Sequence, residues 1–313
     1  MAADIDLLVL GDANPDLILH GGDVVPAFGQ AEHLVADARL TMGGSGAILS
    51  CGAAKLGLRV AICALIGDDL FGRFVREGLD AAGVDTTGIA TDETAATGVT
   101  VVLSGPDDRA IITMPGTVAG LRAELIDPSL LERARHVHVS SYYLQTALVP
   151  ALPGIFDGVH DHGGTTSLDP NWDPSDRWDG GLLDLLRKTD VFMPNAMEAT
   201  RLGRTSDLED AVRTLGTRSE LVIVKNGDHG AIAGGQGQLH RVAGLGTAVV
   251  DTTGAGDSFD AGFLAAWLGG EPIDRALAIA NACGALSTRA MGGVDAQATM
   301  DEAVALLEEG SAA

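Results

Sequence analysis

The sequence predicts an α/β protein in which a mostly parallel central sheet is covered by helices on both faces. The main observation is that short apolar runs alternate with longer helical stretches, most regularly in the second half of the chain. Such alternation is typical of strand–helix units that build a parallel sheet. Hydrophobic residues make up 46% of the 313 residues, which is ample for a large core. The length allows one large α/β domain or two smaller ones, and no break in composition marks a linker.

The first half of the chain begins with an apolar run at residues 7–10, which predicts a buried parallel strand ending at Gly11. Residues 17–41 lack helical periodicity. The other elements expected here are helices over 47–56 and 71–82, a strand over 60–65, and a hairpin of strands 99–103 and 110–113 with its turn at 105–108.

Polar residues in the second half follow the apolar runs. The expected strands are 137–139, 166–168, 191–193 and 221–224, and the expected helices include 148–160 and 273–286. Gly11, Asp169, Asn195, Lys225 and Asp251 each come directly or closely after an apolar run. Because ligands bind at the carboxyl ends of parallel strands, we expect these five residues to share one rim of the sheet.

Composition limits the partners and the compartment. The formal charge of −23 argues against nucleic acid or an anionic membrane as a partner, because both are polyanions. No apolar run approaches the length that spans a bilayer, and the acidic start of the chain is unlike a signal peptide. Cys51, Cys63 and Cys283 lack metal-ligand spacing, so we expect reduced, buried thiols in a cytoplasmic protein.

Residues 251–259, Asp-Thr-Thr-Gly-Ala-Gly-Asp-Ser-Phe, carry the strongest functional signal. Gly254, Ala255 and Gly256 allow a tight turn into a helix whose first N–H groups and dipole favour an anion. We expect Asp257, inside this anion site, to be a general base for a substrate hydroxyl. The amides of 254–256 would then hold the charge that builds on a transferred phosphoryl group. The alternative is a glycine-rich helix start with an ordinary first-turn aspartate.

Residues 252–259 also resemble the C-terminal signature of the ribokinase-like (PfkB) carbohydrate kinases. Segments 11–16, 43–47, 194–199 and 225–230 are similar to further motifs of that family, in the same order. The resemblance therefore covers nearly the whole chain.

This resemblance implies a ribokinase-like three-layer α/β/α fold with one catalytic domain over residues 1–313. It also implies a small β-sheet lid formed by about residues 12–41 and 95–115. The activity implied is an ATP-dependent phosphotransferase that acts on a hydroxyl of a small sugar, with Mg²⁺ as cofactor. The alternatives are a nucleoside kinase and a non-catalytic regulator of the same fold that binds a sugar or a nucleotide.

The substrate-binding groups implied by the resemblance are Asn14, Asp16, Gly43, Gly44, Ser45 and Asn171. A carboxylate beside an amide, as in Asp16 and Asn14, can form hydrogen bonds to two vicinal hydroxyls. The alternative is that Asn-Pro-Asp simply forms a turn, in which these residue types are common. Asn171 has the alternative of capping a turn after Pro170.

Two segments depart from the family pattern and bear on the substrate. Ser45 and Ile48 stand where ribokinase-type members often have Lys and Asn, which argues against ribose. Asp173 stands near a position where 2-keto-3-deoxygluconate kinases carry Arg. An aspartate there would repel an anion, which argues against a sugar acid.

The cation sites are implied by two further segments. Asn195 and Glu198 resemble the family's Asn-x-x-Glu element, in which Glu organises Mg²⁺ through water; the alternative is a helix-capping box. Asp251 and Thr253, together with carbonyls around residues 289–293, would form a monovalent-cation site suited to K⁺.

The nucleotide side is implied by Lys225, Gly227 and Gly230, which resemble the turn beneath ATP. Asn281, on the helix 273–286, resembles an adenine-side position, and a solvated helix face is the alternative. Exposed edges of the lid could pair two chains into a homodimer.

Overall fold

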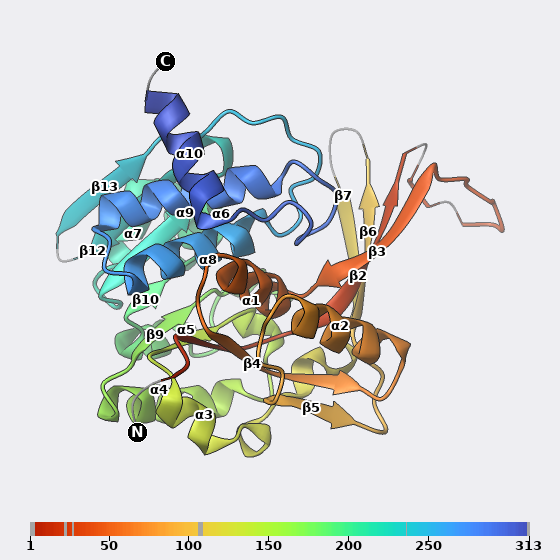
Figure 1. The fold of residues 1–313 in the computed structure, drawn as a ribbon, viewed down its shortest axis with the longest axis horizontal. Helices are drawn as coiled ribbons and strands as arrows, with labels where there is room; N and C mark the ends of the chain where they lie inside the picture. Colours follow the sequence, from red (N-terminus) through yellow and green to blue (C-terminus); the bar gives the residue numbers. More distant parts are fainter. Residues whose placement is uncertain (1–3, 22–23, 27, 106–108, 236, 312–313) are drawn as a thin grey trace.

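The computed structural model describes residues 4–21, 24–26, 28–105, 109–235 and 237–311. A large sheet lies at the centre of the molecule, and a small sheet projects from one side of it (Figure 1). The first three residues and residues 106–108 of the expected hairpin turn lie outside the described residues.

The described part of the large sheet has nine strands in the order β13-β12-β11-β10-β9-β8-β1-β4-β5. They are β1 (Leu7–Leu10), β4 (Val60–Gly67), β5 (Ile89–Asp92), β8 (His136–Val139), β9 (Thr165–Leu168), β10 (Val191–Phe192), β11 (Leu221–Lys225), β12 (Ala231–Gly235) and β13 (Gln238–Val242). Every neighbouring pair from β5 to β11 is parallel, whereas the pairs β11–β12 and β12–β13 are antiparallel, so β12 alone of these nine strands runs in the opposite direction. The mostly parallel sheet is confirmed.

Helices cover both faces of this sheet. One face packs against α1 (Ser45–Lys55), α2 (Leu70–Ala81), α8 (Ala255–Leu268), α9 (Ile273–Ser287) and α10 (Met300–Ser311). The other packs against α3 (Pro128–Arg133), α4 (Leu152–Asp161), α5 (Leu182–Leu185), α6 (Ala196–Gly203) and α7 (Leu208–Leu215). Strand β1 supplies both cores, because its side chains alternate: Leu7 enters the first core and Leu8 the second.

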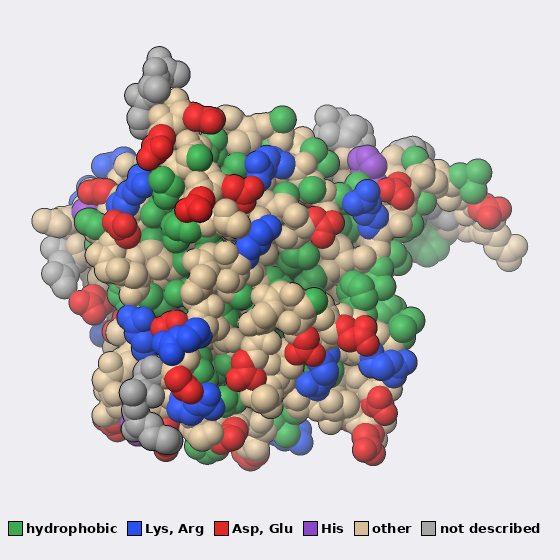
Figure 2. Space-filling model, in the orientation of Figure 1, with side chains coloured by type: hydrophobic (Ala, Val, Ile, Leu, Met, Phe, Trp, Pro, Cys, Tyr) green, Lys and Arg blue, Asp and Glu red, His purple; other side chains and the backbone are tan. Residues whose placement is uncertain are grey.

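The small sheet is built from the two segments that the sequence singles out. Its strands are β2 (Asn14–His20), β3 (Asp37–Gly43), β6 (Val99–Ser104) and β7 (Arg109–Met114), in the order β3-β2-β6-β7. Strands β6 and β7 form the expected antiparallel hairpin. All six residues of β7 are exposed, and Figure 2 shows hydrophobic side chains on this projecting part of the surface.

Short 3₁₀ segments connect these elements. They are η1 (Gly116–Gly120), η2 (Ala123–Leu125), η3 (Tyr142–Leu144), η4 (Val149–Ala151), η5 (Leu186–Lys188) and η6 (Gly227–His229). The stretch before Asp251 forms no strand, so the expectation that Asp251 ends a strand of the rim is wrong. The amides of Val250 and Asp251 donate instead to the carbonyl of Thr288, which ties this stretch to the end of α9.

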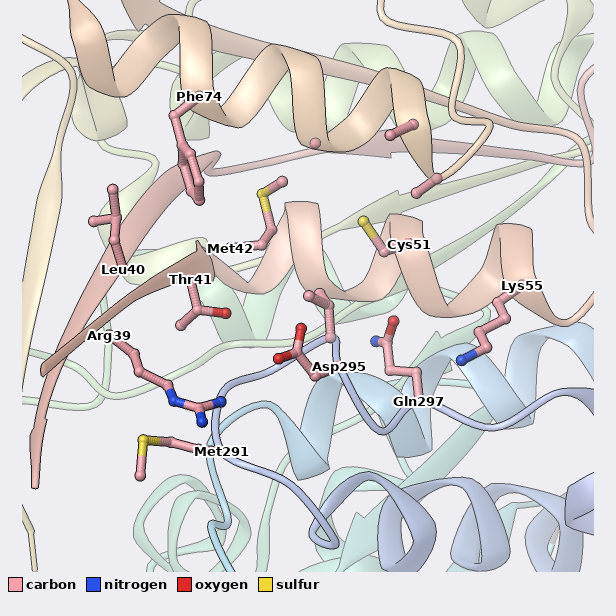
Figure 3. Close-up of a pocket in the computed structure, with 14 residues that line it drawn as sticks. Arg39, Leu40, Thr41, Met42, Cys51, Lys55, Phe74, Met291, Asp295 and Gln297 are labelled. Carbon is pink, nitrogen blue, oxygen red and sulfur yellow. The ribbon is translucent and has the colours of Figure 1, made fainter. Parts of the chain in front are cut away.

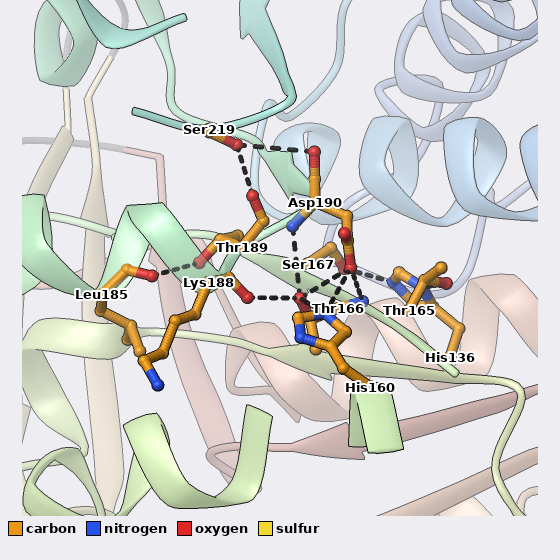
Figure 4. Close-up of polar contacts among 10 residues, drawn as sticks. All are labelled: His136, His160, Thr165, Thr166, Ser167, Leu185, Lys188, Thr189, Asp190 and Ser219. Carbon is orange, nitrogen blue, oxygen red and sulfur yellow. Dashed lines mark hydrogen bonds and ion pairs between the residues drawn. The ribbon is translucent and has the colours of Figure 1, made fainter. Parts of the chain in front are cut away.

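Polar contacts replace apolar packing at one place between β8 and β9. The ring of His136 contacts the hydroxyls of Thr165 and Ser167 at 2.7 and 2.6 Å, and His138 shares the Ser167 hydroxyl. Nearby, Asp190 accepts hydrogen bonds from the amide and hydroxyl of Thr166 (Figure 4). The His136 ring and the three hydroxyls satisfy one another, which helps to fix the register of the two strands, whereas Nε2 of His138 is buried with no hydrogen-bond partner among the described residues.

The three cysteines are buried and none is in a disulfide, as the sequence predicts. Within the described ranges, no helix has the length and apolar character needed to cross a bilayer.

Candidate active site

Helix α8 begins where the sequence predicts, at Ala255, and Gly254 is its N-cap with φ 71°. A side chain at 254 would be strained in this left-handed conformation, and a Cβ there would lie 2.7 Å from the Cα of Gly293. The amide of Ala255 donates to the carbonyl of Thr252 over 3.3 Å. The amides that follow, beginning with Gly256, belong to the turn in which a helix leaves its N–H groups without internal partners. This helix start can therefore receive an anion.

Asp257 lies in the first turn of α8 and is only partly exposed. Burial, with repulsion from Asp169, raises the pKa of Asp257 to about 8. The ammonium of Lys225 and a hydrogen bond from the Ser45 hydroxyl act in the opposite direction. A carboxylate with a raised pKa is a stronger base once ionised, which suits proton abstraction from a hydroxyl.

Asp12 is a site residue that sequence reasoning missed. Its carboxylate accepts hydrogen bonds from the amides of Ser45 and Gly46 at 3.2 and 3.1 Å, so it caps the start of α1. The sequence signal was an acid directly after the turn at Gly11. Its partners lie more than thirty positions away, which is why no local pattern revealed them.

Asn14 and Asp16 lie on β2 rather than in a turn, and residues two apart on a strand share a face. The amide of Asn14 donates to the Thr100 hydroxyl at 3.4 Å. Burial and the neighbouring Asp12 raise the pKa of Asp16 to about 7. The expected pair is thus brought together at the base of the small sheet.

Gly43, the first residue of the Gly43–Gly44 pair, lies beside the carboxylate of Asp16. A Cβ at Gly43 would lie 2.0 Å from Oδ1 of Asp16, and Gly44 is the N-cap of α1 with φ 78°. Ile48, one of the two departures from the family pattern, is 3% exposed, and its side chain packs against Gly254 and Gly293. It shapes the anion-binding loop instead of lining the substrate face.

Asn171 reaches the same region from the loop after β9. Its amide donates to the hydroxyls of Ser141 at 3.0 Å and Ser45 at 3.5 Å. Asp173 does not face a ligand: its carboxylate accepts hydrogen bonds from amides of its own loop, including that of Trp178 at 2.7 Å. The argument that Asp173 repels an anionic substrate is therefore wrong.

Asn195 and Glu198 form the capping box at the start of α6. Each accepts a hydrogen bond from the other's amide, at 2.9 and 2.8 Å. Glu198 is buried, and burial together with Asp169 raises its pKa to about 7. A buried carboxylate beside another acid is an oxygen donor that a divalent cation would stabilise, so this corner fits Mg²⁺.

Lys225 ends β11 and its ammonium lies between two carboxylates. Its Nζ contacts Asp169 at 2.6 Å and Asp260 at 2.8 Å. The stem of Lys225 passes beside Gly256, where a Cβ would lie 3.7 to 3.9 Å from its Cδ, Cε and Nζ. Sequence reasoning did not find Asp260, which lies one residue past the signature 251–259 in α8 and is followed in that helix by small and apolar residues.

The other residues expected on the nucleotide side surround the stretch after β13. A Cβ at Gly230 would clash with the carbonyl of Val242, and the amide of Asn281 donates to the carbonyl of Ala243 at 2.7 Å. Gly227 opens the η6 turn with φ 56°. Asn281 is 8% exposed, so the alternative of a solvated helix face is wrong.

Asp251 and Thr253 are held against the loop after α9. Oδ1 of Asp251 accepts hydrogen bonds from the amide and hydroxyl of Thr253, and Oδ2 accepts one from the amide of Gly292 at 2.9 Å. Arg109, at the start of β7, donates to the Thr253 hydroxyl at 3.1 Å. This arginine was missed because the small sheet brings together residues 144 positions apart.

A separate pocket of about 840 Å³ lies between β3, α1, α2 and the loop at residues 291–297 (Figure 3). Met42, Cys51 and Phe74 supply its apolar wall, and Arg39 and Lys55 bring basic groups to its edge. None of the residues expected to be catalytic lines it, so this pocket is distinct from the anion-binding helix start.

Fold and site together have the features of a phosphotransferase acting on an alcohol: a glycine-rich helix start, an embedded carboxylate and a facing polar strand. Comparison with known proteins agrees, since the family described as "pfkB family carbohydrate kinase" matches residues 4–300. The chain belongs to the pfkB family of carbohydrate kinases.

Relatives are similar along their whole length. The ATP-dependent ribose-1-phosphate kinase of Halopiger xanaduensis is 32% identical, with 97% of this chain and 99% of that protein covered. The fructokinase of Klebsiella pneumoniae is 31% identical, with 94% and 96% covered. Among solved structures, an E. coli protein assigned as a ribokinase II, in complex with ATP and Mg²⁺, has a TM-score of 0.86 at 26% identity, with 97% and 99% covered.

Proposed function

We propose that the protein is an ATP-dependent kinase that phosphorylates a hydroxyl of a small sugar. The observation that carries this proposal is the position of Asp257 in the first turn of α8, beside Gly256 and in contact with the Ser45 hydroxyl. Asp12 links the start of α1, where Ser45 lies, to the end of β1. Base, anion site and substrate face thus converge.

In the proposed reaction, Asp257 takes the proton of the sugar hydroxyl as that oxygen attacks the γ-phosphorus of ATP. The bond between the γ-phosphorus and the β,γ-bridging oxygen breaks, and ADP leaves. Amides of residues 254–256 neutralise the negative charge that spreads over the transferred group. Because Asp257 must be ionised to act, activity should rise with pH toward its pKa of about 8.

Mg²⁺ would be held through water by Glu198, near Asn195, and its charge would offset that of the nucleotide phosphates. Lys225, Gly227, Gly230 and Asn281 are proposed to form the nucleotide side. Asp251 and Thr253 are proposed to contact K⁺ with carbonyls of the adjacent loop. Potassium stimulation is tested by comparing turnover in K⁺ and in tetramethylammonium buffers at equal ionic strength.

The acceptor is proposed to bind through Asn14, Asp16, Gly43, Gly44 and Asn171. The names of the two relatives make a furanose sugar or its phosphate the first acceptors to test. Arg109 would accommodate a phosphate group, because its guanidinium reaches from the start of β7 to the Thr253 hydroxyl, 3.8 Å from the Asp251 carboxylate. A nucleoside remains a second candidate, since Ser45 is small and leaves room beside the sugar.

The small sheet is proposed to act as a lid that excludes water during transfer. Its exposed apolar side chains, including Ile111 and Ile112 at 58% and Met114 at 42%, are proposed to pair two chains as a homodimer. Light scattering with the Ile112→Glu variant checks this: the expected result is a dimer that dissociates in the variant.

The function is tested by ADP release from MgATP with neutral sugars, sugar phosphates, sugar acids and nucleosides, with mass spectrometry of the product. The expected result is a phosphorylated sugar formed in step with ADP. Tight sugar binding without any phosphorylated product would instead support a non-catalytic regulator.

A further inference from the structure

Lys225 lies within a buried charged cluster in the middle of the proposed active site. Its ammonium contacts Asp169 and Asp260, and the three side chains are 11%, 11% and 0% exposed. Buried ion pairs are costly to form, and a protein that keeps one gains little stability from it. The position of this cluster suggests a functional reason for keeping it.

The cluster is charge-balanced if the two carboxylates share one proton. Burial opposes the charge of Asp169, but attraction to Lys225 and a hydrogen bond from Asp260 lower its pKa. Burial raises the pKa of Asp260 well above its ordinary value, so Asp260 carries the proton. One carboxylate and one ammonium then remain charged.

Lys225 also connects the two sides of the site. Its stem lies beside Gly256, in the helix start that precedes Asp257. Its backbone amide donates to the carbonyl of Pro194 at 3.1 Å, directly before Asn195. Lys225 is therefore placed between the helix start that carries Asp257 and the start of α6, where Asn195 and Glu198 lie.

We propose that Lys225, held by Asp169 and Asp260, is a positioning residue whose positive charge favours the ionised form of the Asp257 carboxylate, which is the form that accepts a proton. The proposal rests on the kinase function above and changes the role expected for Lys225. An ammonium engaged by two carboxylates is not free to act as a direct ligand of the nucleotide.

The charged groups around Asp257 come from several elements. Asp169 follows β9, Lys225 ends β11, Asp12 follows β1, and the Ser45 hydroxyl comes from α1. Of these, Lys225 supplies the positive charge. His136 and His138, the titratable groups on β8, are kept neutral by burial, which lowers the pKa of each to about 3.

The test is the pH dependence of kcat/KM in Lys225→Met, with Lys188→Met as the matched control. Lys188 forms an ion pair with Asp157 on the surface, so its loss changes the net charge equally. The acid limb of this profile is the pH range over which kcat/KM rises as Asp257 ionises. In Lys225→Met this limb should move to higher pH by about one unit, because a neighbouring positive charge has been lost. Activity at pH 7 should fall roughly tenfold and recover as the pH rises. The control should keep the limb of the parent protein.

An equal loss at every pH, with the limb unmoved, would overturn the proposal and leave Lys225 a structural role. If Lys225→Met does not fold, Lys225→Gln replaces it, because its amide removes the positive charge and still donates hydrogen bonds to the two carboxylates. The same upward movement is expected there, and an unmoved limb would again reject the proposal.

A second readout needs no sugar. The melting temperature is measured against pH for the parent protein and Asp257→Asn, and again for Lys225→Met and the double variant Lys225→Met/Asp257→Asn. Within each pair, the pH at which the difference in melting temperature changes gives the midpoint of the Asp257 titration. Should no sugar be phosphorylated by the parent protein, the kinase function fails, yet this titration still tests Lys225. The midpoint should move upward in Lys225→Met, and an unchanged midpoint would reject the positioning role.

Discussion

Replacing Asp257 with asparagine should stabilise the folded protein at pH 8 and have little effect near pH 4. Burial and Asp169 raise the pKa of Asp257 from 3.8 to about 8. At pH values between these two, the unfolded chain releases this proton and the folded chain keeps it. Stability contributed by the protonated group is therefore complete below pH 4 and is lost as the pH rises toward 8.

The magnitude follows from the size of that interval. Each pH unit corresponds to about 1.4 kcal/mol, so the interval from 3.8 to about 8 corresponds to at most roughly 6 kcal/mol. Asp257 is partly exposed, and solvent screening should reduce the effect to about 3 kcal/mol. For a chain of this length that is about 6 °C in melting temperature. An asparagine cannot titrate, so the variant avoids this loss.

The assay is thermal unfolding of the parent protein and Asp257→Asn in a buffer series from pH 4.5 to 9. Asp16 and Glu198 are present in both proteins, so the difference between the two curves isolates Asp257. Asp228→Asn is the control, because that side chain is 91% exposed and its replacement should change little at any pH. A difference that stays constant with pH, or a variant less stable at pH 8, would refute the reasoning.

Three further substitutions test the site. Gly43→Ala should raise the KM for the sugar by about 100-fold or more and spare nucleotide binding, because its Cβ would fall on the Asp16 carboxylate; equal losses for both ligands would argue against this. Arg109→Ala should weaken a phosphorylated acceptor about tenfold more than its neutral counterpart, as separate KM measurements would show; equal effects would remove Arg109 from substrate recognition. Asn281→Ala should raise the KM for ATP about three- to tenfold through loss of the hydrogen bond to Ala243, and an unchanged KM would disconnect that stretch from the nucleotide.

Local patterns were enough to predict six of the nine described strands of the large sheet and the start of α8, but not β5, β12 or β13. Apolar runs of four or five residues located β1 and β11, and glycine at 254 marked the helix start. Strand β3 was not predicted as a strand, since four of its seven residues are exposed and no buried face alternates along it. Strand β3 pairs with β2, and the sequence of β3 by itself gives no sign of this pairing.

The residues missed in the site share a different cause. Asp12, Arg109 and Asp260 act on groups that are 33, 144 and 35 positions away. Their roles depend on how the sheet and helices pack, and a one-dimensional pattern contains no such information. Asp173 is the opposite case. The sequence suggested that this acid faces a ligand, but its carboxylate accepts hydrogen bonds from amides of its own loop.

The most direct test of the central claim is sugar-dependent ADP release by Asp257→Asn, with MgATP affinity measured on the same sample by calorimetry. We expect kcat to fall by about 10³-fold or more, while the dissociation constant for MgATP changes by less than about threefold. Turnover within tenfold of the parent protein, at unchanged nucleotide affinity, would contradict the assignment of Asp257 as the base.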